Sequence, residues 1–241
     1  MSSGGATPEP RGPVTVWWAT RRPLADLDLS PLSREERARV DRLGTQPARE
    51  RSALARALVR AALADALGGA PGSFQVGWQR GPALLGHAAS SISISLSHSA
   101  DRVVVALTEG AAVGVDIEPA GRGERLRPTV VERITTPDER RELAALGLPA
   151  RERAAIQLWT AKEAVLKATR EGLETEPHTV EILGLPEVTQ LSAHARRPEL
   201  VGACHVSALA LDPDYVGSLA QLSASAPPVV ERDADAGRLL S

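Results

Sequence analysis

The chain has 241 residues, of which 43% are hydrophobic and 2% aromatic, and its formal net charge is −2. This length and composition favour one compact domain, or two small lobes, around an aliphatic core. The charge excludes the global basic field typical of nucleic-acid-binding proteins, and a single cysteine excludes an internal disulfide. Because the chain has neither a signal-peptide pattern nor an apolar run of roughly 18 residues, we expect a cytoplasmic protein that binds neither nucleic acid nor membrane.

The first elements are marked by turn and capping residues. Residues 1–13 are rich in Gly, Pro and Ser and are expected to form a disordered tail. Ser33 followed by Glu36 has the spacing of a capping box at the start of a helix, and Pro47 suits the first turn of the next one. The predicted elements before residue 80 are a strand over 14–19, helices over 33–43 and 47–67, and a strand over 74–78.

The segment SISISLS, residues 91–97, alternates serine with apolar residues and predicts a strand with one apolar face. Residues 102–107 and 113–117 are the next strands, and the short turns between the three predict an antiparallel meander.

The second half of the chain repeats the succession of helices and strands. The predicted elements are helices over 128–134, 137–146 and 150–170 and strands over 179–183, 201–211 and 215–223. We therefore expect an α+β fold, a pseudo-dimer of two similar lobes, each with a small, mostly antiparallel sheet and a long helix. The expected boundaries are 14–112 for the N-terminal lobe, 113–224 for the C-terminal lobe and 225–241 for a C-terminal tail.

Two acidic residues stand out in the strand VGVDIEP, residues 113–119. Asp116 and Glu118 are two apart, so their carboxylates should point to the same face of the strand, opposite Ile117. Two acids so close raise each other's pKa unless a cation lies between them. The alternative is a solvated strand end with two surface acids.

The segment WTAKEAVLK, residues 159–167, contains the only two lysines among 28 basic residues. Trp159, Glu163 and Lys167 are spaced to share one helix face, whereas Lys162 is offset by about 100°. The simple alternative is an ordinary Glu–Lys pair beside a core tryptophan. Together with Asp116 and Glu118, however, Glu163 completes an oxygen-only set that suits Mg²⁺, and lysine is a compact charge that suits phosphate oxygens.

These two segments, with 42 residues between Asp116 and Trp159, resemble the 4′-phosphopantetheinyl transferases, in particular the larger type that activates nonribosomal peptide and polyketide synthases, with surfactin synthetase as the namesake substrate. The family pattern is a G-[VI]-D strand, roughly forty residues, and then [FW]-[SCT]-x-K-E-x-x-x-K. A looser resemblance extends over about residues 30–222.

The resemblance implies transfer of the phosphopantetheine arm of coenzyme A to a serine of a carrier protein, with release of 3′,5′-ADP. It also implies a monomeric two-lobed fold with coenzyme A and Mg²⁺, or Mn²⁺, in the cleft between the lobes. Asp116, Glu118 and Glu163 would hold the metal, Lys167 would contact the α-phosphate, and Lys162 would be a second phosphate contact.

The proton acceptor is left open by the sequence. Glu163 or Glu139 would take the serine proton, directly or through a water molecule. Glu139 has a second explanation, because Thr136 and Glu139 also have the spacing of a capping box.

The resemblance further implies a set of nucleotide-binding residues. Ser97 and His98 match a Ser-His strand end near the substrate phosphates, Arg51 and Ser52 match a pair in the early helix, and Arg80-Gly81-Pro82 stands where the family has Gly-Lys-Pro or Gly-Arg-Pro. A histidine at a strand end can also be structural, and Arg51 can belong to a solvated helix face. Arg122, Arg125 and Arg127 could attract an acidic carrier protein.

Two other functions fit parts of the sequence. One is a non-catalytic relative that binds coenzyme A or a carrier protein, which the intact acid and lysine set disfavours. The other is an unrelated Mg²⁺-dependent phosphohydrolase, for which the sequence has no further signature.

Overall fold

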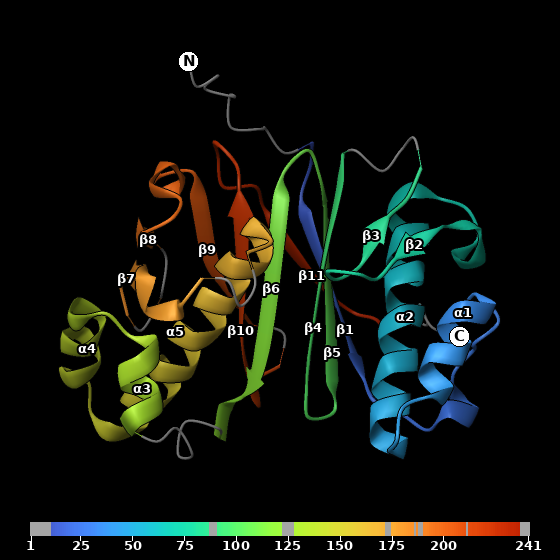
Figure 1. Cartoon of the computed structure of the whole chain (residues 1–241), viewed down its shortest axis with the longest axis horizontal. Coiled ribbons are helices and arrows are strands. Elements are labelled where there is room, and N and C mark those ends of the chain that lie inside the picture. The colour runs from blue at the N-terminus through green and yellow to red at the C-terminus, as the bar shows by residue number, and fades with distance from the viewer. Residues whose placement is uncertain are drawn as a thin grey trace.

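The structure is a computed structural model that describes residues 11–86, 91–121, 128–171, 175–185, 187, 190–210 and 212–236. Most of the expected N-terminal tail, residues 1–13, lies outside these residues, and so do Arg122, Arg125 and Arg127. The described part is a mixed α+β fold with two principal sheets (Figure 1). No helix in that part is both long and apolar enough to span a membrane.

The first sheet has the strand order β11-β1-β5-β4. Its strands are β1 (Val14–Thr20), β4 (Ile92–Ser99), β5 (Arg102–Glu109) and β11 (Val229–Asp233). The helices on its outer face are α1 (Arg34–Asp41) and α2 (Gln46–Leu67), at the right in Figure 1. A short hairpin of β2 (Val76–Gly77) and β3 (Ala83–Leu84) lies beside them.

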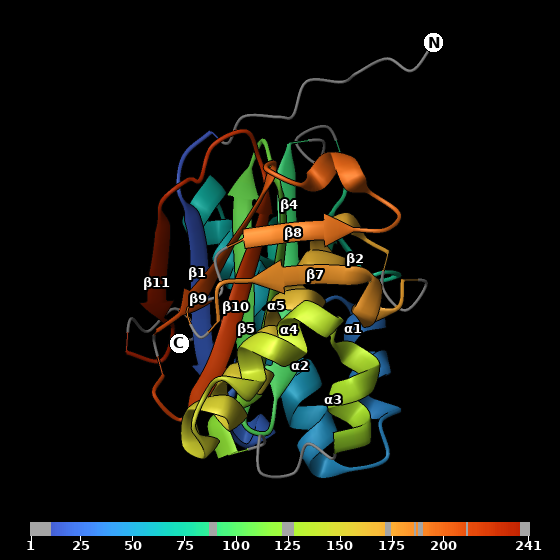
Figure 2. The same cartoon turned by 90° about the vertical axis from the view of Figure 1, so that its left-hand side faces the viewer.

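The second sheet has the strand order β6-β10-β9-β8-β7. Its strands are β6 (Ala112–Pro119), β7 (Val180–Leu183), β8 (Gln190–His194), β9 (Cys204–Leu209) and β10 (Tyr215–Leu222). The helices are α3 (Pro128–Ile134), α4 (Pro137–Ala144) and α5 (Leu148–Thr169). Figure 2 shows α3, α4, β7 and β8 on the side of the molecule that faces away from α2.

The hydrophobic core consists of three clusters, which lie between the layers of helices and sheets. In β1, Trp17 and Ala19 pack with α2, whereas Val16 and Trp18 pack on the opposite face against residues of the second sheet. On the far side of the second sheet, α5 contributes to a third cluster. The molecule is therefore layered as helix, sheet, sheet, helix, and residues of β6 lie at the centre.

The structure confirms most predicted elements and corrects four. β6 does not continue the meander: it leaves β5 and pairs with β10, about 100 residues later in the chain. β8 is an additional strand that is not predicted. The strand expected over 74–78 is reduced to the two residues of β2. Residues 229–233 are not a tail, because β11 pairs in parallel with β1.

Candidate active site

Gly114 sets the distance between β6 and α5. A Cβ atom at this position would lie 1.9 Å from the Ala164 carbonyl oxygen and 2.6 Å from the Ala168 backbone nitrogen. Only glycine therefore allows this close approach of strand and helix. The contact brings the C-terminal half of α5 against the strand that carries the two acids.

The two acids of β6 are buried, so the alternative of a solvated strand end is wrong. Asp116 is 7% exposed and Glu118 is 9% exposed. Both carboxylates accept hydrogen bonds from serines of β4: Ser97 Oγ donates to Asp116 Oδ1 over 2.7 Å, and Ser99 Oγ donates to Glu118 Oε2 over 2.5 Å. Strand alternation thus places the two carboxylates on one face, as predicted.

In the C-terminal half of α5, one face of the helix is partly exposed to solvent. Trp159, Glu163 and Lys167 are half-buried, whereas the residues between them are buried. Trp159 is therefore not a fully buried core residue. Lys167 Nζ lies 2.7 Å from Asp116 Oδ1 and also donates to the Val115 carbonyl oxygen over 2.9 Å. The structure therefore brings the lysine of one motif half into contact with the acid of the other.

Glu163 carries a charge that the described residues do not balance. No hydrogen bond joins its carboxylate to any residue in the described part of the chain. Burial raises the pKa of Glu163, and the negative charges of Asp116 and Glu118 add to the rise, while Lys167 opposes it. The carboxylates of Asp116, Glu118 and Glu163 thus lie near one another and near Lys167, and carboxylate oxygens are the donors that a hard cation takes.

The predictions for Lys162 and Glu139 are wrong. Both side chains are fully buried, and Lys162 Nζ lies 2.6 Å from Glu139 Oε2. Lys162 also donates to the carbonyl oxygens of Ile134 and Pro177, and Glu139 accepts from two backbone nitrogens as well. A side chain with no exposed surface and fully used hydrogen bonds cannot contact a substrate, so this pair is structural. The capping box of Thr136 and Glu139 is confirmed.

A pocket of about 950 Å³ opens between the β2–β3 hairpin, β4, β6 and the end of α5. Arg80 and Pro82 of the hairpin turn line one part of its wall, and Lys167 and Arg170 of α5 line another. Its apolar lining comes from Leu85, Ile94, Leu96, Val113 and Leu166. The pocket therefore joins the predicted nucleotide-contacting turn to the lysine that binds Asp116.

The hairpin turn is anchored through Trp78, which directly precedes it. The Arg56 guanidinium lies over the Trp78 ring, 4.6 Å from its centroid, and Trp78 Nε1 donates to Glu36 Oε1 over 2.8 Å. Glu36 caps α1, as the predicted capping box requires, and pairs with buried Arg60. Helices α1 and α2 thereby fix the wall that carries Arg80.

His98 lies within the electrostatic reach of the same cluster. Burial lowers the pKa of His98, and the positive charges of Arg51 and Lys167 lower it further, whereas Asp116 acts in the opposite direction. The residue keeps exposed surface despite this partial loss of water. Ser52, in contrast, has its hydroxyl oxygen occupied by Arg56 at 2.6 Å.

The residues that would hold Mg²⁺ fit the ion by their chemistry. Asp116, Glu118 and Glu163 supply carboxylate oxygens, which are the hard donors that Mg²⁺ takes. Nevertheless, within the described ranges no three His, Cys, Asp or Glu side chains are already arranged around a metal position. The metal assignment therefore stays a prediction.

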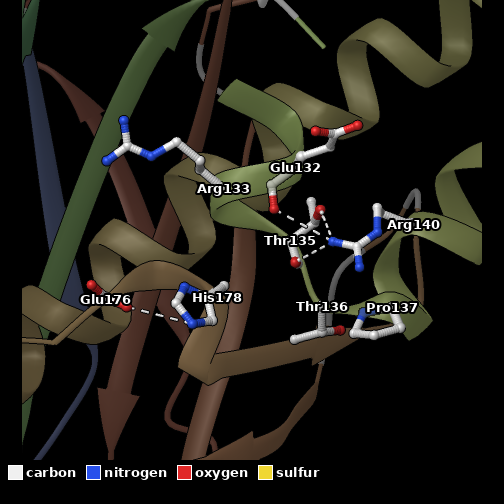
Figure 3. Close-up of a pocket in the computed structure, with 8 residues that line it drawn as sticks. All are labelled: Glu132, Arg133, Thr135, Thr136, Pro137, Arg140, Glu176 and His178. Carbon is white, nitrogen blue, oxygen red and sulfur yellow. Dashed lines mark hydrogen bonds and ion pairs between the residues drawn. The ribbon is translucent and has the colours of Figure 1, made fainter. Parts of the chain in front are cut away.

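A second pocket of about 490 Å³ lies between α3, α4 and the 3-10 helix Pro177–Thr179 (Figure 3). In this pocket Arg140 donates to the Thr135 carbonyl oxygen over 2.7 Å, and His178 lies 3.5 Å from Glu176. None of the predicted site residues lines it.

Sequence reasoning missed Arg170 and Ser99. Arg170 is the C-cap of α5, three residues after Lys167, and both residues line the pocket of about 950 Å³. Ser99 continues the alternating serines of β4 by one more step, and that alternation is the signal that could have found it.

Comparison with known proteins agrees with this geometry. The family model of the 4′-phosphopantetheinyl transferase superfamily matches residues 112–219, which contain both motif halves. The match falls on the region where the motifs predict a resemblance to that superfamily.

The chain is 32% identical over 158 residues to the 4′-phosphopantetheinyl transferase HetI of Nostoc, covering 62% of this chain and 64% of HetI. It is 33% identical over 133 residues to the 4′-phosphopantetheinyl transferase psf-1 of Bacillus pumilus, covering 52% of this chain and 51% of psf-1. The similarity thus spans less than two thirds of the length of either relative.

A solved structure described as a Chronobacterium ammoniagenes ACPS–CoA complex is also similar. It is 22% identical, and the match covers 49% of this chain and 100% of that one, with a TM-score of 0.35. A likeness of this size carries no functional argument.

Proposed function

We propose that this protein transfers the 4′-phosphopantetheine arm of coenzyme A to a serine of an apo acyl or peptidyl carrier protein and releases 3′,5′-ADP. The observation that carries the proposal is the meeting of the two motif halves, because Lys167 binds Asp116 while lining the large pocket. The match of residues 112–219 to the model of the 4′-phosphopantetheinyl transferase superfamily supports the same reaction.

The pocket suits the nucleotide half of coenzyme A. Arg80 and Arg170 have no carboxylate partner within the described residues, and guanidinium groups bind phosphate through paired hydrogen bonds. Leu85 and Leu96 add apolar surface for a flat base or a ribose. His98 and Arg51 are the proposed further contacts to the phosphates.

The proposed chemistry is displacement at the β-phosphate. The carrier serine oxygen forms a bond to the β-phosphorus, and the bond from that phosphorus to the bridging oxygen breaks. The electron pair leaves with 3′,5′-ADP, and Lys167 offsets the charge that develops there.

Glu163 is the proposed acceptor of the serine proton, directly or through a water molecule. Its carboxylate has no hydrogen-bond partner in the described part of the chain, so a carboxylate oxygen is available to accept a proton. We favour Glu163 over Glu139 because the Glu139 side chain is fully buried and bound to Lys162.

Asp116, Glu118 and Glu163 are the residues that would hold a Mg²⁺ ion. When bound, the ion would supply positive charge to the pyrophosphate oxygens. The residues of the chain itself position this charge, because Ser97, Ser99 and Lys167 fix the two acids of β6.

The architecture proposed with this function is a monomeric pseudo-dimer. Each sheet has one long helix against its outer face, and α2 and α5 both have 22 residues. The proposed lobes meet at the boundary between β5 and β6, and an acidic carrier protein would approach the arginines of residues 122–127.

The direct test is to incubate the protein with an apo carrier protein, coenzyme A and Mg²⁺ and to measure the intact mass of the carrier. A gain equal to the phosphopantetheine arm is the expected result. A carrier mass that stays unchanged for several carriers would contradict the transferase and leave a binding role. Release of inorganic phosphate from coenzyme A without carrier modification would indicate a phosphohydrolase instead.

A further inference from the structure

The alternating serines of β4 form hydrogen bonds across the boundary between the two sheets. β4 and β6 are edge strands of different sheets and are not paired through their backbones. Instead, four serine side chains bridge them. Ser93 and Ser95 accept from the backbone nitrogens of Val113 and Val115 over 3.1 and 3.0 Å, and Ser97 and Ser99 donate to the carboxylates of β6.

The first two serines accept hydrogen bonds from backbone N–H groups of the edge strand β6. The outward backbone N–H groups of an edge strand need partners when they are buried, and the hydroxyl oxygens of Ser93 and Ser95 supply them. Small side chains also let β6 come close to β4. The next two serines of the same row stand opposite Asp116 and Glu118.

The last two serines act on the acids. A hydroxyl has a single hydrogen to donate, and in Ser97 that hydrogen is bound to Asp116 Oδ1. Ser97 therefore cannot donate to a coenzyme phosphate at the same time, contrary to the role that the family resemblance implies. Ser97 is 6% exposed, which leaves its bond to Asp116 little competition from water.

We propose that Ser97 and Ser99 are positioning residues that orient the Asp116 and Glu118 carboxylates for a divalent cation. Each hydroxyl fixes one oxygen of its carboxylate by a charge-assisted bond, so that the carboxylate plane is set before the ion arrives. The proposal rests on the proposed function, because it takes the cation site from there. It adds residues of the other lobe to that site.

The test measures Mn²⁺ binding to the full chain by isothermal titration calorimetry, without coenzyme A or a carrier. Ser97→Ala and Ser99→Ala should each weaken binding by about 10–100-fold, as the loss of groups that orient metal ligands typically does. Ser99→Thr keeps the hydroxyl and should restore most of the affinity. Ser93→Ala is the matched control, because Ser93 bonds only to backbone in the same row, and its Mn²⁺ affinity should equal that of the wild type.

Thermal unfolding of each variant shows whether a loss of Mn²⁺ affinity comes from misfolding. If Ser97→Ala does not fold, the comparison of Ser99→Ala with Ser99→Thr still tests the role of the hydroxyl. Wild-type Mn²⁺ affinity in both folded Ser97→Ala and Ser99→Ala would overturn the positioning role and leave the cation site intact. A wild-type protein that binds no Mn²⁺ would overturn both the positioning role and the proposed cation site. An equal loss in Ser93→Ala would also overturn the proposal, because the effect would then belong to the strand contact alone.

Discussion

At the scale of single residues, the two lysines of α5 have different roles although they are only five residues apart. Lys167 is half-buried and binds Asp116, whereas Lys162 is fully buried and binds Glu139. Helical periodicity predicts that they point in different directions. It cannot predict that Lys162 is structural, because its partners come from α3, from α4 and from the 3-10 helix before β7.

The ionised side chain of Glu163 should lower the stability of the folded protein at neutral pH, because it is partly buried near two other acids. Because its folded pKa is raised above 4.5, its contribution to stability is present below that value and is lost as the pH rises through the folded pKa. Glu163→Gln should therefore raise the thermal unfolding midpoint of the metal-free protein at pH 7 while abolishing transfer. The difference should shrink as the pH is lowered toward 4.5. An unchanged midpoint at pH 7, or a gap that widens on acidification, would contradict this electrostatic picture.

Arg170 offers a substitution that removes a side chain without harming the backbone. It ends α5 with φ at 59°, a left-handed conformation that glycine adopts more readily. Arg170→Gly should leave the unfolding midpoint unchanged or slightly higher, yet weaken 3′,5′-ADP binding by roughly tenfold through loss of a charge-assisted contact. Arg153→Ala, an exposed site at the other end of α5, should bind as the wild type does. Equal affinity of Arg170→Gly and wild type in calorimetry would remove Arg170 from the site.

At the scale of elements, the close packing of α5 on β6 assembles the site. Regular patterns predict both elements from the sequence, since α5 has long apolar periodicity and β6 alternates. The partner of β6 could not be predicted, because β10 follows about 100 residues later. The strand β8 was missed because its sequence, QLSAH, has only one large apolar residue, and β11 was missed because it directly follows two prolines in a polar terminal segment.

Gly114→Ala should destabilise the protein and should also displace Asp116 and Glu118, which lie on the same strand. Its Cβ would overlap the α5 backbone, which cannot move as a flexible side chain can, and overpacking of this kind typically costs about 1–3 kcal/mol. Gly217→Ala in β10 is the matched control, because its Cβ would meet only Ile117 and Leu209 side-chain atoms at 3.1 and 3.2 Å. Chemical denaturation should show the larger loss for Gly114→Ala, and an equal loss for both would contradict the close-packing argument.

At the scale of the whole molecule, residues from both halves of the chain meet at one boundary. The motif residues predict the acids and Lys167, but the sequence alone does not show that serines of β4 hold those acids from the neighbouring sheet. Nor does it show that the hairpin turn with Arg80 and the end of α5 line a common pocket. Both facts depend on how the sheets pack, which is determined by contacts far apart in the sequence.

The most direct measurement is the intact mass of an apo carrier protein after incubation with coenzyme A and Mg²⁺, for wild type and for Asp116→Ala side by side. Removal of Asp116 takes away a proposed metal ligand and the partner of Lys167, whereas the apolar cores do not include this side chain. We predict a phosphopantetheine gain with the wild type and none with a folded Asp116→Ala variant. An unchanged carrier with the wild type, or equal transfer by both proteins, would contradict the proposed function of this site.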